Sequence, residues 1–152
     1  MTEIRELLSY RVHVVANLLS RGAELRYRRE FGVSLWEWRT IALLGTCDEP
    51  LSLGHLARAA GIDKSQMSRV VSGLAKRRLV LREADPGDAR GVRLTLTKTG
   101  QRLCTGLIRA AGERDAVFRN CLGKGEKEAF ERTLTKLAGR ARALIEAERA
   151  LK

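Results

Sequence analysis

The forty residues GIDKSQMSRVVSGLAKRRLVLREADPGDARGVRLTLTKTG, numbered 61–100, decide the fold. Their first part carries apolar residues at helical spacing: Met67, Val70, Val71 and Leu74. Their last part changes to the period of two that is typical of a strand with one buried face: Val92, Leu94 and Leu96. The segment Asp85-Pro86-Gly87-Asp88 favours a turn between residues 79–83 and this strand. The stretch therefore predicts a helix followed by a two-stranded β hairpin with a projecting tip.

A short helix over residues 52–60 is predicted directly upstream of this stretch. Gly61 permits a tight turn between the two helices. The small Ala57 allows them to cross closely, and Met67 fills the space between them. Helical hairpins inside protein cores use the same chemistry, but the β hairpin that follows favours a winged helix-turn-helix.

Two pairs of residues mark where helices begin. Ser34 and Glu37 have the spacing of a capping box, and Asp63 and Gln66 have the same spacing. The first pair predicts a helix over residues 35–44, and the second predicts the start of the helix that contains Met67.

Long amphipathic helices flank this central region. An apolar stripe runs through residues 4–25 and ends at Gly32, and two further helices follow Thr97, separated by Gly123 and Gly125. In a chain of 152 residues such apolar faces favour packing against a second copy, and packing within one chain is the alternative. The sequence predicts a mainly α fold with a two-stranded β wing in one domain over 1–152. Dimerisation helices are expected at about 1–30 and 98–152, and a winged helix-turn-helix lobe at about 34–97.

The charge of the chain points to a polyanionic partner. It has 29 Lys and Arg residues against 18 Asp and Glu residues, which gives a net charge of +11. Nine basic and four acidic residues fall between Asp63 and Lys98, so this window, about a quarter of the chain, holds nearly half of the excess. Such an excess attracts nucleic acid, and the alternative is a charged surface that only keeps the protein in solution.

The side chains of the predicted second helix can read DNA. Those in its first turns are Lys64, Ser65, Gln66, Ser68 and Arg69. Arg pairs with guanine and Gln with adenine in the major groove, while Lys76, Arg77 and Arg82 are placed to neutralise phosphates. At the hairpin tip, Arg90 suits the minor groove, and Asp88 can orient it or hold the loop. A surface hairpin with ordinary salt bridges is the alternative for the tip.

These motifs resemble the multiple-antibiotic-resistance regulator (MarR) family. The resemblance covers about Leu7 to Ile145 and is carried by Leu56-Ala57, the helix 65–74, Arg82, Asp88-Ala89-Arg90-Gly91, Leu94-Thr95-Leu96-Thr97 and Gly100. It implies a winged-helix homodimer that is joined through its terminal helices and binds a pseudo-palindromic operator in double-stranded DNA. It also implies repression that small phenolic or aromatic carboxylate ligands relieve. Many members have Gly where Arg78 stands, so a left-handed backbone there would be strained.

The resemblance also implies a ligand pocket between the dimerisation helices and the DNA-binding lobe. The residues that could line it are Tyr10, His13, Asn17 and Trp36, with Arg11 or Arg39 to meet a carboxylate. Packing in the core or the dimer interface is the alternative for Tyr10 and, more strongly, for Trp38. We expect an aromatic carboxylate or its thioester as the effector.

Other classes of function find little support. The two histidines, His13 and His55, lack an acidic partner at a suggestive spacing, and nucleotide-binding and nucleophile motifs are missing, so no enzyme is predicted. No Cys or His pairs have zinc-ligand spacing, and neither a metal nor a cofactor is expected. Three cysteines form no disulfide framework; we expect buried, reduced thiols at Cys47, Cys104 and Cys121. A peroxide-sensing thiol is therefore disfavoured.

The start of the chain lacks the pattern of a signal peptide, and no apolar run is long enough for a bilayer, so a cytoplasmic protein without membrane contact is expected. A sequence-specific DNA-binding repressor is the favoured function. The alternative is a basic winged-helix module that binds an acidic protein or RNA.

Overall fold

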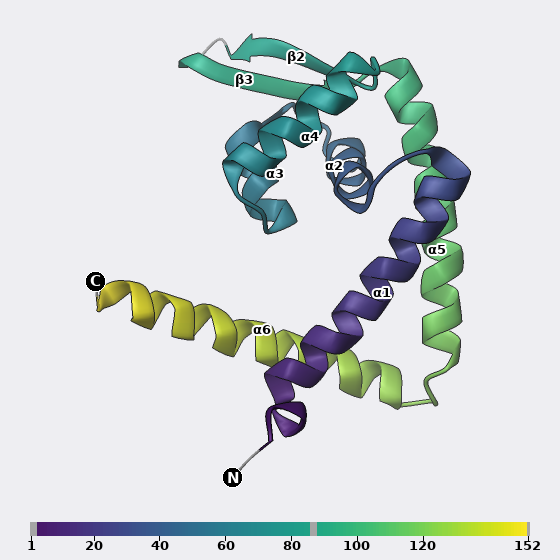
Figure 1. Ribbon diagram of the computed structural model, residues 1–152, viewed down its shortest axis with the longest axis vertical. Helices are drawn as coiled ribbons and strands as arrows, with labels where there is room; N and C mark the ends of the chain where they lie inside the picture. The colour runs from purple at the N-terminus through teal and green to yellow at the C-terminus, as the bar shows by residue number, and fades with distance from the viewer. Residues whose placement is uncertain (1–2, 86–87, 152) are drawn as a thin grey trace. The chain divides into compact units, whose positions relative to one another are not determined.

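The computed structural model describes residues 3–85 and 88–151, without the side chains of 88–90 (Figure 1). Its elements are η1 (Ile4–Glu6), α1 (Leu8–Phe31), α2 (Leu35–Gly45), β1 (Leu51–Ser52), α3 (Leu53–Ala60), α4 (Lys64–Lys76), β2 (Val80–Asp85), β3 (Asp88–Leu96), α5 (Lys98–Asn120) and α6 (Glu126–Ala150). Contacts divide the chain into two compact units, Met1–Ala111 and Gly112–Lys152, so α5 contributes to both. The predicted mainly α fold with a small antiparallel sheet is confirmed.

The helix-turn-helix forms as the sequence predicts. α3 ends at Gly61, which adopts the left-handed conformation with φ 71°, and the Ile62 amide donates to the Ala57 carbonyl oxygen at 3.1 Å. Ala57 and Met67 are both buried where α3 and α4 meet. Thr40 of α2 donates a hydrogen bond to the Met67 sulfur at 3.5 Å, so α2 closes the third side of this small core.

In the described residues the sheet has three strands, whereas the sequence predicted two. β2 and β3 form the antiparallel hairpin, with Val80 opposite Leu96, and β1 pairs with the outer edge of β3. A strand of two residues is too short to show an alternating pattern, which is why β1 was missed. The hairpin strands also extend to Asp85 and Asp88, two residues that were predicted to lie in the turn. Figure 1 shows the hairpin beside α4 and projecting beyond it.

Side-chain caps fix the starts of α2 and α4. The Ser34–Glu37 capping box is complete: the Ser34 hydroxyl accepts from the Glu37 amide at 3.2 Å, and the Glu37 carboxylate accepts from the Ser34 amide at 2.7 Å. At α4, Asp63 accepts from the Gln66 amide at 2.7 Å, which is the Asp63 half of the predicted box. Both caps satisfy amides that have no partner within their own helix.

Two of the three cysteine predictions are wrong. Cys104 is buried between α5 and α2, as expected, but Cys47 and Cys121 are exposed. Cys47 follows the end of α2 and Cys121 follows the end of α5, so neither is held on an apolar helical face.

Among the residues that the structure describes, no helix is both long and apolar enough to cross a membrane.

Arg78 is strained, as the departure from the family pattern predicted. Its φ of 56° places a non-glycine residue in the left-handed region, between α4 and β2. Arg78→Gly should raise the free energy of unfolding by about 0.5–1 kcal/mol, because about 1–2 kcal/mol of strain is relieved and part of it is offset by the greater freedom of glycine in the unfolded chain.

Thermal unfolding should show this change as a melting temperature about 1–4 °C higher. Lys76→Gly is the matched control, since Lys76 is helical and exposed, and glycine there should lower stability by about 1 kcal/mol. A lower melting temperature for Arg78→Gly would show that its backbone is not strained.

Candidate nucleic-acid interface

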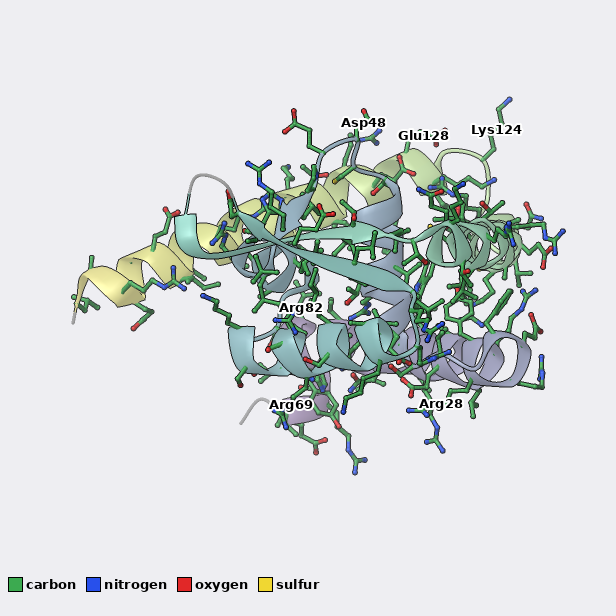
Figure 2. All side chains as sticks on the ribbon, turned by 90° about the horizontal axis from the view of Figure 1, so that it is seen from above. Arg28, Asp48, Arg69, Arg82, Lys124 and Glu128 are labelled. Carbon is green, nitrogen blue, oxygen red and sulfur yellow. The ribbon has the colours of Figure 1, made fainter. Side chains whose placement is uncertain are left out.

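The first turns of α4 present the predicted base-reading side chains at the surface. Lys64, Ser65 and Arg69 are exposed, while Gln66 and Ser68 are half-buried. Figure 2 shows Arg69 on the side of α4 that faces away from the sheet and Arg82 on the sheet side. Positively charged side chains thus lie on both sides of α4.

Asp63 anchors this end of α4. Its carboxylate accepts from the Ser65 hydroxyl at 2.5 Å as well as from the Gln66 amide. The Ser65 hydroxyl and then the Gln66 amide hold the pKa of Asp63 below its ordinary value, so the cap stays charged at neutral pH. Because its hydroxyl proton is used in the cap, Ser65 has only acceptor capacity left for a base edge.

Two of the three predicted phosphate-binding residues are tied to the scaffold. Lys76 is exposed at the end of α4. The Arg82 guanidinium of β2 donates to the Ser72 hydroxyl of α4 at 3.3 Å, and the Arg77 guanidinium contacts the Glu37 carboxylate at 3.1 Å. The sequence analysis missed Ser72 and assigned Glu37 only to the capping box, because contacts between different elements leave no periodic signal in the sequence.

Lys64 and Arg82 line the same hollow, which has a volume of about 220 Å³. The other lining residues come from the start of α3, from α4 and from β3: Ser52, Leu53, Gly54, Val71, Gly91, Val92 and Leu94. Two cations beside the N-terminal end of α3 make this edge of the lobe attractive to a phosphate group. For Asp88 and Arg90 the structure describes only the backbone in β3, and their predicted roles at the tip lie outside the described side chains.

The candidate effector residues do not form a single cluster. Arg39 stacks over the Trp36 ring at 4.8 Å and lies 3.4 Å from the Ser20 hydroxyl of α1, a contact that the sequence analysis missed. Nearer the start of α1, the side-chain amide nitrogen of Asn17 and Nε2 of His13 form a hydrogen bond of 2.8 Å. Tyr10 and Arg11 are exposed, and Arg11 lies about 160° around the helix from His13.

Arg39 also lines an open hollow of about 370 Å³ between α2 and α3. Most of its other lining is apolar: Trp38, Ala42, Leu43, Thr46, Ala59 and Ala60. Trp38 packs against Tyr27 with ring centroids 5.1 Å apart and belongs to the edge of the core, which confirms the packing alternative for this residue. The sequence analysis predicted a ligand pocket between the dimerisation helices and the DNA-binding lobe, whereas this hollow is lined by residues of the lobe itself.

Reactive chemistry finds no support in the described part of the chain. No three His, Cys, Asp or Glu residues there are close enough together to hold a metal ion. Burial raises the pKa of the Cys104 thiol, so this group is protonated and a poor nucleophile.

Comparison with known proteins agrees with this geometry. A sequence model of the MarR family matches residues 31–91, which contain α2, α3, α4 and the start of β3. The transcriptional repressor NicR from Pseudomonas putida is 32% identical over 88 residues, which are 58% of this chain and 56% of NicR. A MarR/EmrR family transcriptional regulator from Acinetobacter sp. ADP1 has the same fold, with a TM-score of 0.84 and 25% identity over 93% of this chain and 99% of the other. In sequence over residues 31–91, and in fold over most of its length, the chain is similar to MarR-family regulators.

A second solved structure shows how far the MarR fold is shared. The MepR–DNA complex from Staphylococcus aureus matches with a TM-score of 0.82 and 20% identity, over 88% of this chain and 98% of MepR. At this level of identity the match shows the fold alone. The match to NicR spans only a little over half of that relative, so its activity is not transferred directly. These similar proteins are transcriptional regulators, in agreement with the prediction of a regulator and not an enzyme.

Proposed function

We propose that this protein is a MarR-family repressor that binds a two-fold symmetric operator in double-stranded DNA as a homodimer. The observation that carries the proposal is the exposed start of α4, where Lys64, Ser65 and Arg69 stand free of the core on a helix held by the Asp63 cap. Arg77 and Arg82 flank the same helix with positive charge. MepR, which shares the fold, was solved bound to DNA, and NicR is named as a repressor.

Apolar side chains outside the winged-helix lobe support a dimer. In a single chain, Leu18 and Leu25 of α1 are 67% and 65% exposed, and Ile145 of α6 is 52% exposed. Faces of this kind are expected to be covered in solution, and residues 1–30 and 98–152 are the proposed dimerisation segments. The two α4 helices would then enter successive major grooves, with half-sites about ten base pairs apart, and exclude polymerase. A chromosomal target implies a cytoplasmic protein.

Fluorescence anisotropy at two salt concentrations tests the choice of partner. We expect tight, salt-sensitive binding to an operator-length duplex, because each neutralised phosphate releases a counterion. Stronger binding to RNA of the same length, or binding only to acidic protein, would favour the alternative of a basic interaction module.

An aromatic carboxylate or its thioester is the proposed effector, with Arg39 as its anchor. The apolar hollow between α2 and α3 suits a ring, and Arg39, one of its lining residues, has a guanidinium that suits a carboxylate. Arg39→Ala should therefore weaken binding at least tenfold, since a hydrogen bond to a charged group contributes about 1.5–3 kcal/mol.

Isothermal titration against a panel of aromatic carboxylates measures this effect. Arg11→Ala is the matched control and should bind as the wild type does, because Arg11 is an exposed residue of α1 that does not line the hollow. If no compound of a broad panel binds, or if both variants lose affinity equally, Arg39 is not the anchor of an effector site.

A further inference from the structure

Arg77 is held by a residue from a distant part of the chain. It directly follows α4, and its Nη1 donates to Oε1 of Glu37 in α2 at 3.1 Å. The Arg77 side chain is 41% exposed and the Glu37 side chain 19% exposed. The contact therefore has one partner on the scaffold and one partner at the surface that we propose to meet DNA.

Glu37 is itself fixed. Its Oε2 accepts the Ser34 amide at 2.7 Å, and its own amide donates to the Ser34 hydroxyl at 3.2 Å. The capping box thus determines the rotamer of Glu37 and leaves Oε1 free to receive Arg77. The carboxylate also lies at the N-terminal end of α2, where the helix dipole offsets part of its negative charge.

The backbone after Arg77 is held as well. The Arg78 carbonyl oxygen accepts from the Thr97 hydroxyl at 2.8 Å, and the Leu79 carbonyl oxygen accepts from the Thr97 amide at 3.1 Å. Gly100 of α5 approaches the Leu79 carbonyl so closely that a Cβ atom would lie 2.1 Å from its oxygen. The left-handed Arg78 is thus kept in place by its neighbours, and the main chain beside Arg77 is constrained.

We propose that Glu37 is a positioning residue that holds the Arg77 guanidinium ready for a DNA phosphate. This role of Glu37 rests on the proposed function, the binding of an operator in double-stranded DNA. A guanidinium has five N–H donors, and the contact with Glu37 uses Nη1, which leaves other N–H groups for a phosphate. Binding a phosphate with a free arginine would restrict a long side chain, and the ion pair with Glu37 has already restricted it.

The direction in which one substitution changes the affinity for DNA distinguishes a positioning role of Glu37 from a simple effect of its charge. Glu37→Gln keeps the shape of the side chain, and Gln serves at the same position of a capping box. Coulomb attraction alone predicts that removing a negative charge beside the interface tightens DNA binding. Positioning predicts the opposite, and we expect affinity for the operator to fall about three- to tenfold.

The experiment consists of anisotropy titrations of the wild type, Glu37→Gln, Arg77→Ala and the double variant, together with one control variant. Arg77→Ala should reduce the salt slope by about one phosphate contact. The double variant should bind as Arg77→Ala does, because Glu37 acts through Arg77. Glu83→Gln is the matched control: it removes an exposed carboxylate of β2 and should leave binding unchanged or slightly tighter.

Three results would overturn the role of Glu37. They are tighter or unchanged binding by Glu37→Gln, an unchanged salt slope in Arg77→Ala, and an equal further loss when Glu37→Gln is added to Arg77→Ala. The last would indicate a general effect on the fold, which thermal unfolding of Glu37→Gln measures independently. If the wild type does not bind double-stranded DNA, the proposed function fails, and with it this role. If the wild type binds and Arg69→Ala weakens binding as expected, only the role of Glu37 is at stake.

Discussion

Replacing Arg69 by alanine should relax the preference of this protein for its own operator. Arg69 is exposed near the start of α4, on the side that faces away from the sheet (Figure 2). An arginine in this position of a recognition helix pairs with the edge of a guanine, and such a pair contributes about 1–3 kcal/mol of discrimination. Operator affinity should therefore fall about five- to 150-fold, while affinity for random duplex falls far less.

Competition anisotropy with operator and random duplexes measures this ratio. Arg109→Ala is the matched control, because Arg109 is an exposed arginine of α5 outside the winged-helix lobe and its loss changes the net charge equally. The control should keep the wild-type ratio. Equal losses of Arg69→Ala on operator and random DNA would assign Arg69 to the phosphate backbone instead of a base.

Replacing Leu18 by aspartate should convert the protein to a monomer and reduce operator affinity at least a hundredfold. Leu18 is 67% exposed in a single chain, so the substitution is harmless unless another copy covers it. In a dimer interface the carboxylate would be buried without a partner, which costs several kcal/mol. A monomer also loses the second half-site, whose contribution to affinity through linkage is about 10²–10⁴.

Sedimentation equilibrium of the free protein shows the oligomeric state directly. Leu81→Asp is the control for the substitution itself, because Leu81 is 48% exposed on β2 and lies outside the proposed dimerisation segments. The control should sediment as the wild type does. If Leu18→Asp also sediments as the wild type does, the face of α1 that contains Leu18 does not lie in a dimer interface.

The parts of the structure that the sequence predicted are those with a local physical signal. The spacing of Met67 and Leu74, the left-handed Gly61 and the Ser34–Glu37 cap all depend on residues within one or two helical turns. The strain at Arg78 was also expected, because only glycine adopts φ 56° without cost.

The parts that were missed depend on contacts between distant segments. The partner of Arg77 lies forty residues away, and Ser20 and Arg39 meet only because α1 and α2 pack together. β1 is ordered by its pairing with β3 and not by its own two residues. The exposure of Cys47 and Cys121 follows from where α2 and α5 end, and such boundaries are the least certain feature of a sequence pattern.

Selection of duplexes from a random pool by the purified protein, followed by sequencing of the bound fraction, tests the central claim most directly. A dimer that reads bases through α4 should enrich a two-fold symmetric motif with half-sites about ten base pairs apart. Binding without any enriched motif would contradict the claim and leave only a basic winged-helix surface that attracts phosphates.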